Sequence, residues 1–385
     1  MQELYDLSPL LRMMLVGVLL ACGPLVWVAY QHRRTPQRRF QALTLLTLFL
    51  TFDLVLFGAF TRLTDSGLGC PDWPGCYGHA SPLGASTDIA AAQSIMPTGP
   101  VTHGKAWVEM IHRYLATSVG VLILVLAAMS WMAHWRKSPG QALTPWWPTL
   151  TLLWVCIQGA FGALTVTMKL FPAIVTLHLM GGLVLLALLC VQVVKSAQLE
   201  ADAPPVPISR GLRSLLVLSF ALLVLQIALG GWVSTNYAVL VCSEFPLCQN
   251  SWWPTMNFQQ GFELWRELGL TKAGQPISFS ALTAVHYVHR LVAYVVLALL
   301  CVLAWRLNRV VALRSASRWL ALLISLQLIT GLSNVVLDWP LLAAVLHTGG
   351  AGALVVVMTW VLTASHKSTS IVAPVASNKP KRDAP

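Results

Sequence analysis

The stretch WVEMIHRYLATSVGVLILVLAAMSWMA at residues 107–133 is long and apolar enough to cross a lipid bilayer as one helix. Its His-Arg pair at 112–113 recurs at 289–290, within a second apolar run of the same length at 279–305. A neutral imidazole inside hydrocarbon is costly and needs a partner. Two such segments with the same pair therefore predict a duplicated membrane protein whose histidines have a function.

The composition of the whole chain is that of a membrane protein. Of 385 residues, 56% are hydrophobic and only 10% are charged, and the mean hydropathy is +0.69. Nine apolar runs are long enough to span roughly 30 Å of hydrocarbon. They cover residues 10–30, 41–62, 107–133, 147–168, 173–194, 213–235, 279–305, 317–337 and 341–364.

Matched spacings relate the two halves of the chain. A glycine precedes the first cysteine of a pair by 12 residues, and the two cysteines are 6 apart; a glutamine precedes a glycine by 4, and that glycine precedes a histidine by 16. The first set is Gly58, Cys70, Cys76, Gln158, Gly162 and His178, and the second is Gly230, Cys242, Cys248, Gln327, Gly331 and His347. These spacings predict an all-α polytopic membrane protein with two pseudo-symmetric four-helix bundles plus one extra N-terminal transmembrane helix.

The predicted organisation has five parts. Residues 1–40 hold the extra helix and a basic inner loop, and 41–198 form the first repeat. An inner linker at 199–212 leads to the second repeat at 213–364, and 365–385 is predicted to be a disordered inner tail.

The placement of Lys and Arg predicts the orientation of the chain. Seventeen of the 25 basic residues lie on one set of alternate connections: Arg33, Arg34, Arg38, Arg39, Arg136, Lys137, Lys195, Arg210, Arg213, Arg306, Arg309, Arg314, Arg318, Lys367, Lys379, Lys381 and Arg382. The pattern predicts a bacterial-type inner (plasma) membrane protein with its N-terminus outside and its C-terminus in the cytoplasm. The net charge of +11 is then a signal of topology and of attraction to anionic lipid, and it indicates no nucleic-acid partner.

Two cysteine pairs lie in the long loops that this topology places outside, 63–106 and 236–278. An oxidising compartment permits disulfides, although spacing alone does not determine connectivity. The simplest pairings are Cys70–Cys76 and Cys242–Cys248. Two roles stay open for these pairs: a structural cross-link, and a redox-active role or one in the transfer of haem.

The four histidines in membrane-length segments suit a haem better than a zinc ion or a di-iron centre. All are predicted in the outer half of the membrane, where each pair can meet across a four-helix bundle: His112, His178, His289 and His347. Imidazole is a common axial ligand of haem iron. Zinc prefers three or four close ligands, and a di-iron bundle needs two Glu-x-x-His motifs where this chain has one.

The repeats differ three residues before the His-Arg pair, where the first has Glu109 and the second His286. A carboxylate at this depth is expensive unless it pairs or acts. Glu109 is thus predicted either to form an ion pair with Arg113 or Arg62, or to serve as an acid/base group beside a substrate porphyrin. Arg113 and Arg290 are predicted to bind haem propionates or to snorkel to the surface.

Two motifs resemble those of the haem A synthases, membrane enzymes that convert haem O to haem A for cytochrome oxidase. GAFTRLTDSGLGCPDWPGCYG (58–78) resembles the first helix and loop of that family, and EMIHR (109–113) resembles its Glu-x-x-His-Arg motif. The resemblance covers about residues 41–364 in eight helices, so the helix at 10–30 departs from the pattern.

The resemblance implies a role for each half of the chain. The C-terminal half would carry a permanent haem b on His289 and His347, as an electron relay. The N-terminal half would receive haem O between His112 and His178, and successive hydroxylations would turn its C8 methyl into a formyl group with Glu109 assisting proton movement.

The resemblance also implies a role for the first cysteine pair and a set of partners. The pair Cys70 and Cys76 is linked to the reaction cycle in the family. Haem O synthase and cytochrome oxidase assembly factors are the implied partners, besides membrane lipid. The electron acceptor (quinone included) and the oligomeric state (a homo-oligomer included) stay open.

Three other classes explain part of the sequence. A haem-b electron-transfer or haem-export protein accounts for the histidines but leaves Glu109 unused. A quinone-linked disulfide oxidase accounts for the cysteine pairs but needs no matched histidines. A secondary transporter accounts for the duplication, yet four helices per repeat give parallel units and no broken helix is evident.

Overall fold

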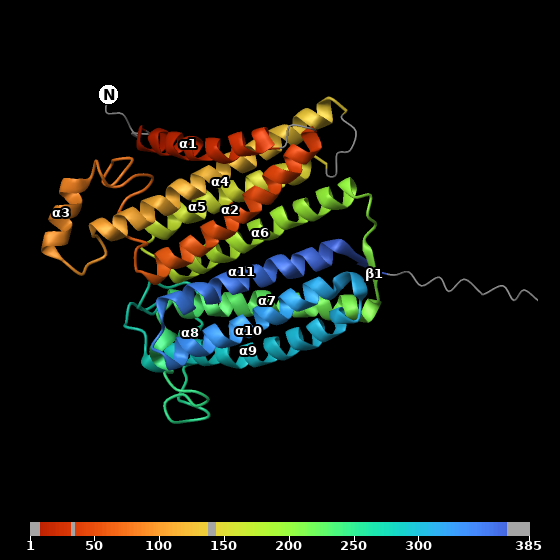
Figure 1. The fold of residues 1–385 in the computed structure, drawn as a ribbon. Coiled ribbons are helices and arrows are strands. Elements are labelled where there is room, and N and C mark those ends of the chain that lie inside the picture. Colours follow the sequence, from red (N-terminus) through yellow and green to blue (C-terminus); the bar gives the residue numbers. More distant parts are fainter. Residues whose placement is uncertain (1–7, 32–34, 138–143, 368–385) are drawn as a thin grey trace, which may run out of the picture.

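The computed structural model describes residues 8–31, 35–137 and 144–367. Within these ranges nine helices are long and apolar enough to cross a membrane, and they match the nine predicted segments (Figure 1). The prediction of an all-α polytopic membrane protein is therefore confirmed. Several residues used for the orientation lie outside the described ranges: Arg33, Arg34, Lys379, Lys381 and Arg382.

The long helices are α1 (Ser8–Gln31), α2 (Pro36–Leu63), α4 (His103–Trp135), α5 (Trp146–Thr167), α6 (Pro172–Glu200), α7 (Arg210–Thr235), α9 (Phe279–Asn308), α10 (Arg314–Val336) and α11 (Leu341–Ala364). The short elements are α3 (Ser86–Ile95), β1 (Val206–Ile208), η1 (Val239–Val241), α8 (Phe258–Gly261), η2 (Val311–Leu313) and β2 (Ser365–Lys367).

Local sequence explains where the long helices begin. Thr35, Thr102, Ser209 and Ser278 each accept a hydrogen bond from the backbone N–H three residues later, at the start of α2, α4, α7 and α9. Proline stands at the start of α2 and of α6, where its missing N–H leaves no helical bond unmade.

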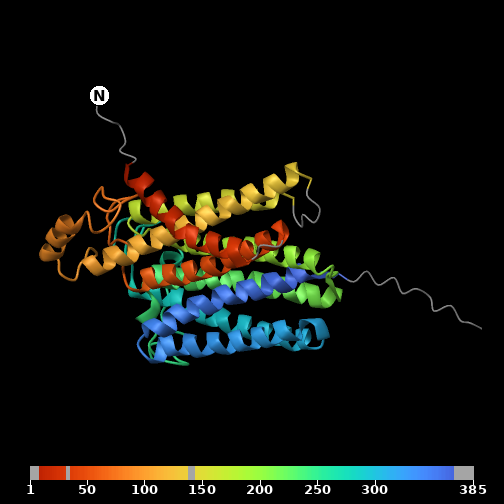
Figure 2. The same ribbon diagram turned by 45° about the horizontal axis from the view of Figure 1, so that its top comes forward.

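Eight of the long helices form two groups of helices that are consecutive in the chain and pack on one another, and α11 of the second group also packs extensively on α2 and α6. The first consists of α2, α4, α5 and α6, and the second of α7, α9, α10 and α11. The two groups meet where α2 and α6 pack against α7 and α11, and they form two stacked layers in both ribbon views (Figures 1 and 2). Helix α1 lies on the outside of the first group against α4, where Gly17 permits close approach to Thr117.

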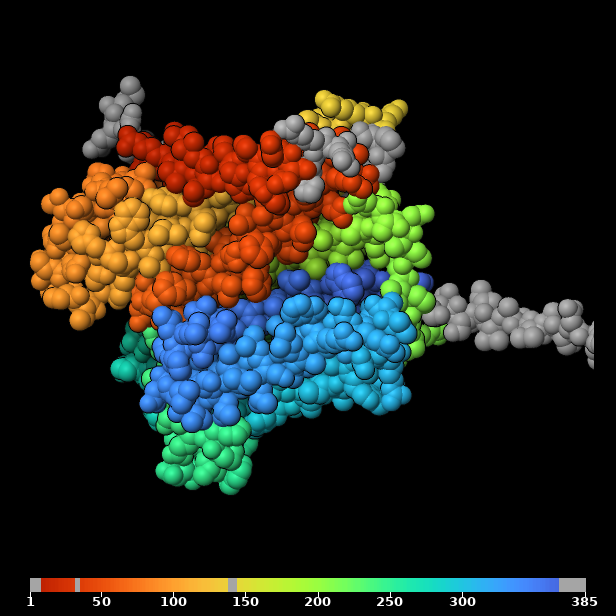
Figure 3. Space-filling view, in the orientation of Figure 1, coloured from red at the N-terminus to blue at the C-terminus, as the bar shows by residue number. Residues whose placement is uncertain are grey.

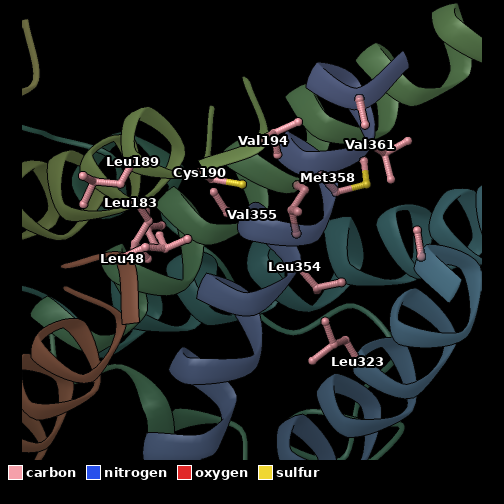
Figure 4. Packing of buried hydrophobic residues seen from close by; sticks show 14 of the residues in the cluster. Leu48, Leu183, Leu189, Cys190, Val194, Leu323, Leu354, Val355, Met358 and Val361 are labelled. Atoms are coloured by element: carbon pink, nitrogen blue, oxygen red, sulfur yellow. The ribbon is translucent and has the colours of Figure 1, made fainter. Parts of the chain in front are cut away.

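The interface between the groups is an apolar core. Leu183 and Cys190 of α6 lie on the side of α11 that carries Val355, near Met358, and all four side chains are buried (Figure 4). Close packing of such side chains in lipid depends on complementary shape rather than on the exclusion of water. This core holds the two groups in one fixed arrangement.

The C-terminal ends of α2 and α7 contact each other at equivalent positions of the repeat. Arg62 donates to the carbonyl of Ser234 at 2.6 Å, and the Tyr237 hydroxyl donates to Asp65 at 2.7 Å. Each pair is separated by 172 residues, as are Gly58 and Gly230, so residues at equivalent positions of the two repeats contact each other here. Burial raises the pKa of the Tyr237 hydroxyl, which therefore stays protonated as a donor.

The two ends of the molecule differ. The segments 64–102 and 236–278 both cover one end, called the loop end below (Figures 1 and 3). At the opposite end β1 pairs in parallel with β2. The predicted tail is thus ordered through residue 367, because its first three residues share a ladder with 206–208 of the predicted linker. The remainder of the tail lies outside the described residues, and the five-part division itself remains a prediction.

Candidate functional site: two matched histidine pairs

The structure brings the four predicted histidines together as two pairs. His112 of α4 is close enough to His178 of α6 for an electrostatic interaction, and His289 of α9 has the same relation to His347 of α11. Each lies six to ten residues into a helix that begins at the loop end, which is about 9–15 Å along the helix axis. The four rings therefore lie at a similar depth below the loops.

The protein does not fully enclose the four histidines. Each histidine lies deep among the helices, yet each retains some accessible surface. Two imidazoles on facing helices that both keep some accessible surface fit the axial ligation of a flat macrocycle.

Glycines on neighbouring helices allow the rings to lie against backbone. A Cβ built on the glycine would lie 2.9 Å from Cε1 of the ring for Gly58 with His112, 3.5 Å for Gly162 with His178, 2.9 Å for Gly230 with His289 and 3.1 Å for Gly331 with His347. Three of these distances are shorter than ordinary van der Waals contact. The matched spacing of glycine and histidine in the sequence thus has a steric cause.

Replacing Gly230 with alanine is expected to push the His289 ring aside. Overpacking costs about 1–3 kcal/mol, so haem retention should weaken by roughly 5- to 150-fold. Haem content of the purified variant, measured by absorbance per chain, tests this. Gly159→Ala is the matched control, since a Cβ there meets nothing within 4 Å. Equal haem content in both variants would contradict the steric role of Gly230.

The bonds to Nδ1 differ between the two pairs. In the second half, His347 Nδ1 lies 3.0 Å from the Thr330 hydroxyl, and His289 Nδ1 lies 3.0 Å from the Gln226 amide nitrogen. In the first half, Nδ1 of His112 and Nδ1 of His178 are buried and have no hydrogen-bond partner among the described residues. The second pair is therefore fixed in orientation by side chains that the first pair lacks.

Both predicted disulfides are present, Cys70–Cys76 and Cys242–Cys248, and the predicted pairings are confirmed. Glu109 reaches the first of them, because its Oε2 accepts a hydrogen bond from the Cys70 backbone N–H at 2.7 Å. Its Oε1 accepts from Arg113 Nη2 at 2.5 Å, and both side chains are buried. The predicted ion pair of Glu109 with Arg113 is thus present.

The arginines of the two His-Arg pairs bind the disulfide loops in the same way. Arg113 Nη1 donates to three carbonyl oxygens of residues 72–75, the shortest to Gly75 at 2.6 Å. Arg290 donates to the carbonyls of Leu247 at 2.9 Å and Cys242 at 3.3 Å. Each loop is therefore fastened to the helix that carries a histidine of the pair, and the predicted propionate contacts of the two arginines remain predictions.

Other polar contacts at the loop end were not anticipated. Arg62 forms an ion pair with Asp65 at 3.3 Å, and Glu109 forms its ion pair with Arg113. Arg266 is buried within the second loop and donates to the Asn236 side chain, a contact that no spacing in the sequence indicates. By contrast, the Thr330 contact has a signal, since it directly precedes the matched Gly331.

The described residues contain no group of three or more His, Cys, Asp or Glu side chains arranged for a metal ion. Each histidine pair offers two imidazoles, which is the number of axial ligands that a metal already held in a macrocycle takes. Residues 41–359 match the family model COX15-CtaA, described as cytochrome oxidase assembly protein. The chain belongs to this family. The matched range includes both histidine pairs and both disulfides, whereas α1 lies outside it.

Relatives of known name match over most of this chain. A haem A synthase of Shewanella oneidensis is 36% identical over 326 residues, which are 84% of this chain and 96% of the relative. The haem A synthase of Rhizobium etli is 28% identical over 350 residues, 83% of this chain and 88% of its own. The haem A synthase of Halalkalibacterium halodurans is 26% identical over 305 residues, which are 76% of this chain and 86% of the relative. The resemblance to haem A synthases is confirmed.

Proposed function

We propose that this protein is a haem A synthase, an oxidoreductase that converts the C8 methyl of haem O into a formyl group by successive hydroxylations. The observation that carries the proposal is the presence of two matched histidine pairs in a chain that shares 36% identity with a haem A synthase over 84% of its length. Haem export or simple electron transfer would require the pairs but not the buried Glu109.

We assign haem b to His289 and His347, and haem O as substrate to His112 and His178. A hydrogen bond that Nδ1 donates orients a ligating imidazole and raises its basicity, and the Thr330 hydroxyl oxygen can accept such a bond from His347. The Gln226 amide nitrogen, 3.0 Å from His289 Nδ1, holds the other ring of the second pair in place. A resident group needs tight ligation, whereas a substrate has to leave as product. When bound to the second pair, haem b supplies one-electron redox chemistry.

The residues near the first pair suit proton movement at the substrate. Glu109 precedes His112 by three residues, so the two lie on the same face of α4. The Cys70 N–H and the Arg113 guanidinium hold its two carboxylate oxygens. We propose that Glu109 accepts or donates the proton during oxidation. We also propose that a change in the redox state of the Cys70–Cys76 disulfide shifts the Glu109 carboxylate through its hydrogen bond from the Cys70 N–H.

We also propose the orientation that the basic residues predict, with the loop end outside and the β1–β2 end in the cytoplasm. Arg213 at the β1–β2 end bonds to the Ser365 carbonyl, and Arg38 there pairs with Glu200. A fluorescent protein fused to the C-terminus would fluoresce in a bacterial host if this end is cytoplasmic, and would stay dark if it is exported. The proposed partners are haem O synthase, assembly factors of cytochrome oxidase and a separate electron acceptor.

The proposed activity is tested in a host that makes haem O and no haem A. Expression of this chain should produce haem A, which chromatography and mass identify in extracted porphyrins. The double variant His112→Ala/His178→Ala should produce none, because the substrate has lost both ligands. Absence of haem A with well-folded wild-type protein that still binds haem b would instead favour an electron carrier or exporter.

A further inference from the structure

One position of the repeat separates the two histidine pairs. Thr330 of α10 and Phe161 of α5 are counterparts, since each directly precedes the glycine that lies against a histidine ring. The hydroxyl of Thr330 lies 3.0 Å from His347 Nδ1. A phenylalanine side chain offers no acceptor, and Nδ1 of His178 is buried without a partner among the described residues.

The direction of the Thr330 bond follows from its second partner. The Thr330 hydroxyl lies 2.6 Å from the Leu326 carbonyl oxygen, which can only accept, so the single hydroxyl proton is donated there. The oxygen then presents a lone pair to His347, whose Nδ1 carries the proton. This tautomer leaves the lone pair of Nε2 free for iron, as a ligating imidazole requires.

The position of His347 is fixed from its backbone as well. The side-chain amide of Gln327, one turn before Thr330, donates to the carbonyl oxygen of His347 at 2.9 Å. Two adjacent turns of α10 therefore hold α11 and its imidazole in register. In the first half, the counterpart Gln158 lies against Gly181, and its Oε1 is buried without a partner among the described residues.

We propose that Thr330 is the positioning residue that makes the second pair a tightly binding, resident haem site. Phe161 at the equivalent position leaves His178 without an acceptor, so the first pair releases its porphyrin readily. The inference rests on the proposed function, because it assumes that the two pairs bind haem b and haem O. It adds the residue that distinguishes the resident site from the exchanging one.

The test compares Thr330→Val with Thr330→Ser. Valine keeps the shape and removes the acceptor, so haem b should transfer to excess apomyoglobin about 10- to 100-fold faster, in line with the effect of lost outer-shell bonds on metal affinity. Its reduction potential should rise, since the imidazole becomes a weaker donor to iron. Serine should restore both properties. Thr363→Val is the matched control, because that hydroxyl also bonds back to a carbonyl four residues earlier, but on α11 away from the ring.

The reciprocal variant Phe161→Thr should slow the release of haem O from the first pair in the same transfer assay. Haem transfer from Thr330→Val at the wild-type rate and unchanged potential would overturn the inference and leave the proposed function standing. Wild-type protein without haem b would overturn the proposed function itself. A Thr330→Val protein that unfolds is recognised by its thermal transition, and Phe161→Thr then decides the question, since unchanged release of haem O overturns the inference.

Discussion

Replacing His347 with alanine is expected to remove haem b from the purified protein and to abolish formation of haem A. The variant deletes one of the two imidazoles of the second pair and leaves only His289 there. The Thr330 hydroxyl also loses its second partner. The haem content per chain, measured from the absorbance of the pyridine complex, should fall by the amount of haem that one site binds.

A control histidine separates this effect from general destabilisation. His366 lies at the β1–β2 end, where its Nδ1 is 3.0 Å from the Pro205 carbonyl, and His366→Ala should keep the wild-type haem content. Added imidazole should fill the cavity left by His347→Ala and restore part of the haem b. Retention of haem b in the variant without imidazole would remove His347 from the site.

Glu109→Ala is expected to lower the rate of haem A formation by at least about 100-fold while haem b remains bound. The carboxylate bonds to Cys70 and Arg113 in the first half and touches neither residue of the second pair. Loss of one partner also leaves the buried Arg113 charge uncompensated, which costs about 3–5 kcal/mol of stability. Porphyrins extracted from cells report haem A, and the purified variant reports haem b.

Glu109→Gln distinguishes proton transfer from anchoring of the loop. A glutamine can still accept a hydrogen bond from the Cys70 N–H, but its side chain does not titrate. Loss of haem A in both variants with the Cys70–Cys76 disulfide intact supports a proton role. Normal turnover of Glu109→Gln would show that the carboxylate only fastens the loop, and normal turnover of Glu109→Ala would remove it from the mechanism.

The sequence predicted those features that the duplication repeats. His178 and His347 have the same sequence separation from Gly162 and Gly331, because the glycine lies against the histidine ring in both halves. The apolar length of the spans and the close cysteines followed from hydropathy and spacing in the same way. Features of this kind need only local sequence or a comparison of the two repeats.

Contacts between a side chain and the backbone of a distant segment, or between two distant backbone segments, were not predicted. Arg113 and Arg290 bind loop carbonyls. Every residue has a backbone carbonyl, so the residue types do not indicate which one will accept a hydrogen bond. The pairing of β1 with β2 joins segments that the repeats do not relate. Thr330 is an intermediate case, since a comparison with Phe161 reveals the difference but only the structure shows the bond to His347.

The most direct test of two haem sites with different roles is the identity of the porphyrins bound to the purified wild-type protein. Non-covalent porphyrins are extracted from protein made in a host that supplies haem O, and are identified by chromatography and mass. We predict haem b together with haem O, a hydroxylated intermediate or haem A. Haem b alone, with no haem A produced by the cells, or no porphyrin in well-folded protein, would contradict the account.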